Sequence, residues 1–172
     1  MNVRFLPLVL LASCAPASAP VTDADRDATA TQVRAASLAL VDAMSAHEPD
    51  SILSFYRLDP GFVYVGCTEY LFGGEAFSSV IRGYHVNNPD VRYDAAVRSV
   101  RVLGPDVAMV SLQGTSSPDV AIFTTRVLGR GEDGRWRVEW EHESWPGCSA
   151  PTPPHPGTAP GDTLTSEPGS GT

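Results

Sequence analysis

The chain has 172 residues, of which 42% are apolar and 19% are charged, as in an ordinary soluble domain. Its 12 cationic residues, all of them Arg, stand against 20 acidic residues, and the formal net charge at pH 7 is −8. A surface this acidic repels nucleic acid and anionic lipid headgroups, so we expect no nucleic-acid binding.

The first residues have the pattern of an export signal. Arg4 supplies a positive charge, and the apolar stretch 5–11 that follows is too short to cross a bilayer as a helix. Leu-Ala-Ser-Cys at positions 11–14 resembles the lipobox of bacterial lipoproteins, in which the Cys is joined to lipid and the chain is cut just before it. The resemblance implies lipid, palmitate included, on Cys14. An ordinary secretory signal, cut after Ala19, is the alternative.

This resemblance also implies a location. Ala15 follows the lipidated Cys, where an Asp would act as an inner-membrane retention signal in that family. We therefore expect attachment through Cys14 to the cell envelope, on the periplasmic side of the outer membrane if the cell is Gram-negative.

Composition divides the chain into four parts. We expect a signal peptide at 1–13, a flexible tether at 14–27, a folded domain at 28–148 and a disordered tail rich in Pro, Gly, Ser and Thr at 149–172. Without Cys14, two cysteines remain, and an exported protein favours a disulfide between Cys67 and Cys148. Two unpaired cysteines are the alternative.

Helical patterns occupy the first half of the predicted domain. Apolar residues recur at helical spacing over 28–46, Pro49 suits the first position of a short second helix, and Gly73-Gly74 leads into a third helix over 75–84. Two short strands, 62–67 and 71–72, lie between the second and third helices.

The second half of the predicted domain reads as strands joined by tight turns. The expected strands cover 91–103, 107–115, 120–128 and a final segment within 135–145. Helices followed by an antiparallel meander predict an α+β fold rather than an alternating α/β fold.

The final strand alternates in an unusual way. A period of two places Trp136, Val138, Trp140, His142 and Ser144 on its inner face. The outer face then carries only charged residues: Arg135, Arg137, Glu139, Glu141 and Glu143. We expect this charged row to be solvated or to serve as a partner surface.

The order of these motifs resembles the nuclear-transport-factor-2-like superfamily, in particular its SnoaL-like and ketosteroid-isomerase-like bacterial branch. Five stretches carry the resemblance: Ile-x-x-Phe-Tyr at 52–56, Asp-Pro-Gly-Phe-Val at 59–63, GGEAFSSVIRGY at 73–84, Arg-Val-Leu-Gly-Pro-Asp-Val-Ala at 101–108 and Asp-Gly-Arg-Trp-Arg-Val at 133–138. The resemblance implies three N-terminal helices packed in the concave face of a curved, mostly antiparallel sheet, a cone with an apolar pocket inside. It also implies that a homodimer could form through the outer face of the sheet.

The resemblance predicts which side chains line that pocket. They are Tyr64, Phe77, Tyr84, Trp140 and His142. Trp136 is expected in the core, and core packing is also the alternative for Tyr64 and Trp140.

Residues of the isomerase do not carry over to this chain. Its carboxylate base falls near Tyr64 and its Tyr near Leu40, and neither residue suits the role. The sequence also lacks Gly-x-Ser-x-Gly, Cys-x-x-Cys and His-x-x-x-His patterns, and we expect neither a metal nor a cofactor.

Three functions remain open. The first is an exported, lipid-tethered domain that binds a small, largely apolar molecule or a peptide in the cone without catalysis. The second is an isomerase, dehydratase or cyclase that uses His142 as acid or base, with Tyr64 as a further candidate. The third is an envelope interaction module whose cone is filled by its own side chains.

Overall fold

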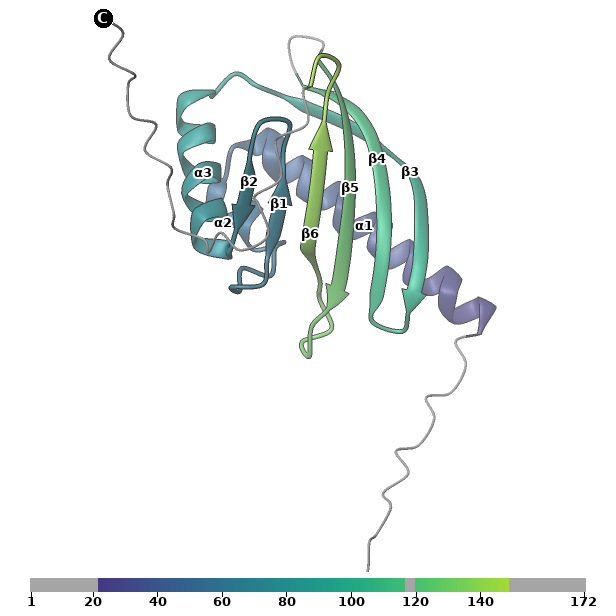
Figure 1. Cartoon of the computed structure of the whole chain (residues 1–172). Coiled ribbons are helices and arrows are strands. Elements are labelled where there is room, and N and C mark those ends of the chain that lie inside the picture. The colour runs from purple at the N-terminus through teal and green to yellow at the C-terminus, as the bar shows by residue number, and fades with distance from the viewer. Residues whose placement is uncertain (1–21, 117–119, 149–172) are drawn as a thin grey trace, which may run out of the picture.

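A computed structural model describes residues 22–116 and 120–148, which form three helices and a six-stranded sheet (Figure 1). The helices come first, with the first two strands between the second and the third: α1 (Asp23–Ala46), α2 (Pro49–Leu53), β1 (Val63–Val65), β2 (Tyr70–Phe72) and α3 (Gly74–Asn87). Four longer strands follow: β3 (Tyr93–Gly104), β4 (Val107–Ser116), β5 (Val120–Arg130) and β6 (Trp136–Ser144). The predicted α+β class is confirmed.

Helix α1 begins at Asp23, inside the segment that the sequence suggested as tether. The Thr22 side chain accepts a hydrogen bond from the backbone N–H of Asp25, and the Asp25 carboxylate accepts one from the backbone N–H of Thr22. This capping box gives the helix a stable start before the apolar stripe begins. The helix ends at Ala46, and its C-cap residue His47 adopts the left-handed conformation with φ 54°.

The six strands form one curved sheet in the order β2-β1-β6-β5-β4-β3, and the sheet does not close into a barrel. Neighbouring strands are antiparallel except β1 and β6, which are parallel. Figure 1 shows α1 crossing one face of the sheet, with α2 and α3 near the β1–β2 hairpin. The core lies between α1 and the sheet, where Val33, Leu40, Val110 and Val138 are almost completely buried.

A β-bulge interrupts β6 and reverses its alternation. Val138 pairs with Leu128 of β5, and Trp140 pairs with Val127, so Glu139 has no partner residue on β5. One inserted residue turns every later side chain of a strand to the other face. Trp136 and Val138 are buried in the core as predicted, but beyond the bulge Glu141 takes the inward position, where it is only 1% exposed.

The bulge depends on a small residue in the neighbouring strand. The Glu139 carboxylate lies where a Cβ atom at Gly129 would be, and it forms an ion pair with Arg57, with 2.5 Å between Nη1 and Oε1. Only glycine leaves this space open. The close approach, rather than backbone strain, is therefore the reason for Gly129.

The predicted disulfide between Cys67 and Cys148 is present, with a Cα–Cα distance of 5.1 Å. It joins the segment that follows β6 to the loop after β1. Within the described residues, no helix is both long enough and apolar enough to cross a membrane. The predicted signal peptide, Cys14 and the predicted tail at 149–172 lie outside the described residues.

Candidate functional site

A cavity of about 380 Å³ lies between the inner face of the sheet and the helices. Most of its wall is apolar or aromatic, and a few carboxylates and one imidazole complete it. Described residues of the wall are Met44, Tyr56, Tyr64, Glu69, Phe77, Val80, Ile81, Tyr84, His85, Tyr93, Ser116, Val120, Ile122, Glu141, Glu143 and Trp145. The volume lies within the range of roughly 300–1,000 Å³ typical of small-molecule sites.

Three of the five predicted pocket residues line this cavity, and two do not. Tyr64, Phe77 and Tyr84 are in the wall, with Phe77 fully buried and Tyr84 exposed at 40%. The predicted inward orientation of Trp140 and His142 is wrong. Both follow the Glu139 bulge and therefore lie on the outer face, where their rings stack with centroids 6.3 Å apart.

The same bulge brings into the cavity wall two carboxylates that the period-two reading placed outside. Glu141 and Glu143 now point inward with Trp145 beyond them, whereas Glu139 stays on the outer side with Arg57. The prediction of an entirely solvated acidic row is therefore wrong for Glu141 and Glu143. A residue count along one strand cannot detect an insertion that only the neighbouring strand reveals.

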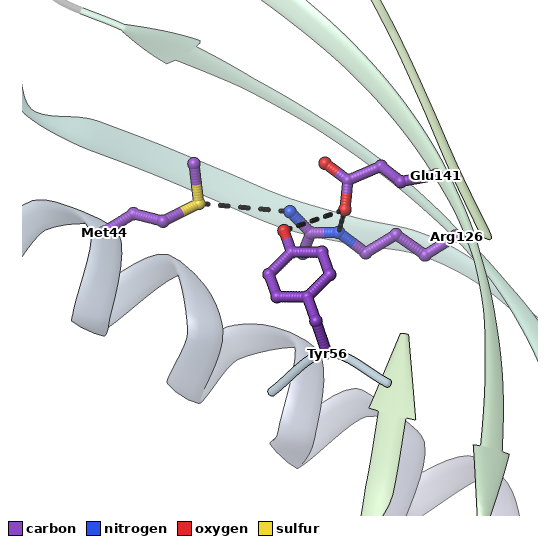
Figure 2. Close-up of polar contacts among 4 residues, drawn as sticks. All are labelled: Met44, Tyr56, Arg126 and Glu141. Atoms are coloured by element: carbon purple, nitrogen blue, oxygen red, sulfur yellow. Dashed lines mark hydrogen bonds and ion pairs between the residues drawn. The ribbon is translucent and has the colours of Figure 1, made fainter. Parts of the chain in front are cut away.

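Glu141 is held by a buried polar cluster that Figure 2 shows. Its Oε2 accepts hydrogen bonds from Nε of Arg126 at 2.7 Å and from the Tyr56 hydroxyl at 3.0 Å. Arg126 is 2% exposed and Tyr56 is 4% exposed. Burial and the charge of Glu141 raise the pKa of Tyr56, so this phenol remains a neutral donor. We interpret this cluster as structural, because the charges of Arg126 and Glu141 neutralise each other within it.

Arg126 extends from β5 toward α1. One of its terminal nitrogens, Nη2, lies 4.0 Å from the Met44 sulfur, and Nη1 is buried without a hydrogen-bond partner among the described residues. Burial acts against the charged form of Arg126, but the charges of Glu141, Tyr56 and Glu143 and the hydrogen bond to Glu141 together outweigh it and raise the guanidinium pKa. Such a pair is costly to break, because the remaining partner would be a buried, uncompensated charge.

Glu143 differs from Glu141 in having no such partner. It is half-buried, and no hydrogen bond or ion pair to its carboxylate is present among the described residues. Burial, reinforced by the charge of Glu141 and opposed by Arg126, raises the pKa of Glu143 to about 7. This carboxyl can therefore exchange a proton near neutral pH, unlike an ordinary glutamate.

Tyrosines form the wall near Glu143. Burial and the charges of Glu143 and Glu141 raise the pKa of Tyr64 far above its ordinary value. The pKa of Tyr93 is raised by burial and by its hydrogen bond with Tyr84. These hydroxyls remain protonated at any physiological pH, so they can serve a ligand as hydrogen-bond donors and acceptors but not as bases.

A pair of histidines lies at the α3 side of the cavity. His85 is 4% exposed, and its Nδ1 lies 3.0 Å from Nδ1 of His47. Burial and the neighbouring His47 lower the pKa of His85, so its ring is neutral near pH 7. The sequence pattern indicates neither histidine as a site residue.

Within the described residues, no three His, Cys, Asp or Glu side chains lie close enough together to hold a metal ion. The chemistry that the wall offers is hydrogen bonding, one carboxyl with a pKa near 7 and aromatic surface. Of the residues that sequence reasoning missed, Arg126 gave the best signal. It is a single Arg inside a strand with Val127 and Leu128 next to it, which favours a buried, paired cation over a solvated one.

Comparisons with known proteins support the fold. An NTF2-like family protein from Streptomyces avermitilis superimposes with a TM-score of 0.62 at 22% identity, over 70% of this chain and 97% of that one. A ketosteroid isomerase-like protein from Erwinia carotovora atroseptica gives 0.55 at 16% identity, over 67% and 94%. An NTF-2 like protein of unknown function from Silicibacter pomeroyi gives 0.55 at 19%, over 72% and 98%.

No protein-family model matches the chain, and no curated protein matches it. The likeness to these solved structures shows a fold of the NTF2-like kind, which is the cone that the sequence predicted.

Proposed function

We propose that this domain binds a small, largely apolar molecule in the cavity of about 380 Å³. The cavity itself is the observation that supports this function. A cone filled by its own side chains would favour an interaction module, whereas a hollow wall with a few polar groups is typical of a ligand site. Phe77 and Tyr64 provide apolar contact area at one side, and Glu143 provides a polar group in the same wall.

Native mass spectrometry of the protein purified from its own cell envelope tests this function. We expect a reproducible bound mass in the wild-type protein. Val80→Trp places an indole in the cavity wall and should abolish that mass. Val86→Trp is the matched control, because Val86 lies on the same helix, is 74% exposed and does not line the cavity. Equal retention of the ligand by both variants would contradict binding in this cavity.

A second candidate is a proton-transfer enzyme, such as an isomerase or dehydratase, that uses Glu143 as its base. The pKa of about 7 favours this candidate, since a general base works best when its pKa is near the working pH. His142 cannot take this role from the outer face. Glu143→Gln should then abolish turnover of a substrate and leave its binding intact. A substrate turned over equally well by the variant would rule out Glu143 as the base.

Lipid attachment at Cys14 and the envelope location are also proposals, and they rest on Leu-Ala-Ser-Cys at positions 11–14. The full-length protein expressed in a bacterial cell should partition into the detergent phase of Triton X-114 and carry an acylated N-terminal peptide. Cys14→Ser should move it into the aqueous phase. A water-soluble wild-type protein cut after Ala19 would support the secretory alternative.

A homodimer through the outer face of the sheet is a further proposal. Trp140 and His142 lie on this face, and Phe72 and Phe123 are each 45% exposed. Light scattering on the purified protein should then give twice the monomer mass, and Trp140→Glu should give the monomer. A monomeric wild-type protein would contradict the dimer.

A further inference from the structure

The charges of the cavity wall are almost all of one sign. Glu69, Glu141 and Glu143 contribute carboxylates, whereas no Arg is among the described residues of the wall and the chain has no Lys. Arg126 neutralises Glu141 in the buried cluster, but no ion pair to Glu69 or Glu143 is present among the described residues. The wall therefore has a negative potential that the protein itself does not balance.

His85 adds to this wall a buried nitrogen that has no hydrogen-bond partner among the described residues. Nε2 of His47 lies 2.6 Å from the carbonyl oxygen of Val91 and 2.8 Å from Nη1 of Arg92. One of the two Nδ1 atoms donates to the other at 3.0 Å, so this contact occupies Nδ1 of His85.

The other nitrogen of His85 remains available to a ligand. Its Nε2 has no hydrogen-bond partner among the described residues although the side chain is 96% buried. A buried polar atom in this state requires a partner. A ligand that enters the cavity can supply one.

Aromatic rings complete the wall. Tyr64, Tyr84, Tyr93 and Trp145 all line the cavity, and Phe77 lies beneath Tyr64 with ring centroids 5.4 Å apart. The faces of such rings attract cations, the more strongly when the cation is removed from water. The carboxylates of Glu69 and Glu143 and the aromatic faces together favour a positively charged ligand with N–H donors.

Building on the binding function proposed above, we propose that the ligand is an apolar organic amine bound as its ammonium ion. Its N–H groups donate to the Glu143 carboxylate, and Nε2 of His85 is a second polar atom in the same wall that has no partner among the described residues. Its apolar body lies against Phe77 and the tyrosines. A carboxylate or phosphate ligand is disfavoured, because it would add a negative charge to a wall that already carries unbalanced ones.

Amine binding has a proton signature. Glu143 holds a proton at pH 6, because its pKa is about 7, and it must release the proton to pair with an ammonium ion. We expect the release of about 0.9 proton per ligand at pH 6 and a much smaller release at pH 8. The charged and titratable groups that influence Glu143 or share the cavity with it are Glu69, Glu141, Arg126, Tyr56, Tyr64, Tyr84, Tyr93 and His85.

Three probes of one shape test the charge preference: 4-phenylbutylamine, 4-phenylbutanol and 4-phenylbutyrate. Titration calorimetry on the full chain, in two buffers of different ionisation enthalpy, gives both the dissociation constant and the number of protons released. We expect the amine to bind at least about tenfold more tightly than the alcohol, and the carboxylate to bind most weakly. Glu143→Gln should remove most of the preference for the amine and the proton release, while binding of the alcohol is retained.

Glu132→Gln is the matched control, because Glu132 is an exposed acid outside the cavity wall. It should leave all three dissociation constants within about twofold of wild type. An alcohol that binds as tightly as the amine, or a preference for the amine that survives Glu143→Gln, overturns the amine proposal and leaves the binding function standing. The binding function is overturned as well if none of the three probes binds and if Val80→Trp and Val86→Trp both retain any native ligand.

Discussion

Removing the charge of Glu143 should stabilise the protein at alkaline pH and leave its stability at acid pH almost unchanged. The folded-state pKa of this carboxyl is about 7, above its ordinary value of 4.5, so the folded chain keeps a proton that the unfolded chain has already lost. The wild-type protein therefore loses stability as the pH rises from about 4.5 to about 7. Glu143→Gln has a neutral side chain of the same shape and does not undergo this loss.

The magnitude follows from the two pKa values. Each tenfold change in an ionisation constant corresponds to about 1.4 kcal/mol, and the difference between 4.5 and 7 gives a ceiling of about 3 kcal/mol. Because Glu143 is only half-buried, solvent screening reduces this to about 1–3 kcal/mol. Glu143→Gln should thus unfold at higher urea concentration than wild type at pH 8, whereas the two proteins should nearly coincide at pH 4.5.

Urea unfolding followed by tryptophan fluorescence, with the disulfide intact, measures this difference at several pH values. Glu132→Gln provides the baseline, because it removes an exposed acid and should parallel wild type throughout. A Glu143→Gln protein less stable than wild type at pH 8 would refute the argument. So would a stability difference that stays constant between pH 4.5 and pH 8.

Three further predictions concern the parts of the fold that support the cavity. Arg126→Met should destabilise by about 3–5 kcal/mol in urea unfolding, because it leaves the buried Glu141 carboxylate without its cation, and the double variant that adds Glu141→Leu should recover much of the loss. Gly129→Ala should lower the unfolding midpoint because its Cβ meets the Glu139 carboxylate, and this loss should shrink when Glu139→Ala is added. Cys148→Ser opens a disulfide that closes a separation of 81 residues, and both it and reduced wild type should lose about 2–4 kcal/mol. Additive losses in either double variant, or an unchanged midpoint after reduction, would contradict these assignments.

Local patterns in the sequence were sufficient for the order and type of the elements. Apolar residues at helical spacing predicted α1 and α3, and alternation with turn residues between strands predicted β3 to β6. The boundaries shifted where caps act, as at Thr22, whose hydrogen bonds begin the first helix five residues earlier than its apolar stripe suggested. The disulfide was predictable because Cys67 and Cys148 are the two cysteines within the predicted domain 28–148.

The composition of the cavity wall was decided by the tertiary structure. The bulge at Glu139 exists because β6 pairs with β5, where Gly129 leaves room for a carboxylate. Because of the inserted residue, Glu141 and Glu143 point inward, whereas Trp140 and His142 point outward. The sequence identified the residues of this strand but not the face of the sheet to which each side chain points. That orientation depends on how the strand pairs with its neighbour, and the pairing forms only when the chain folds.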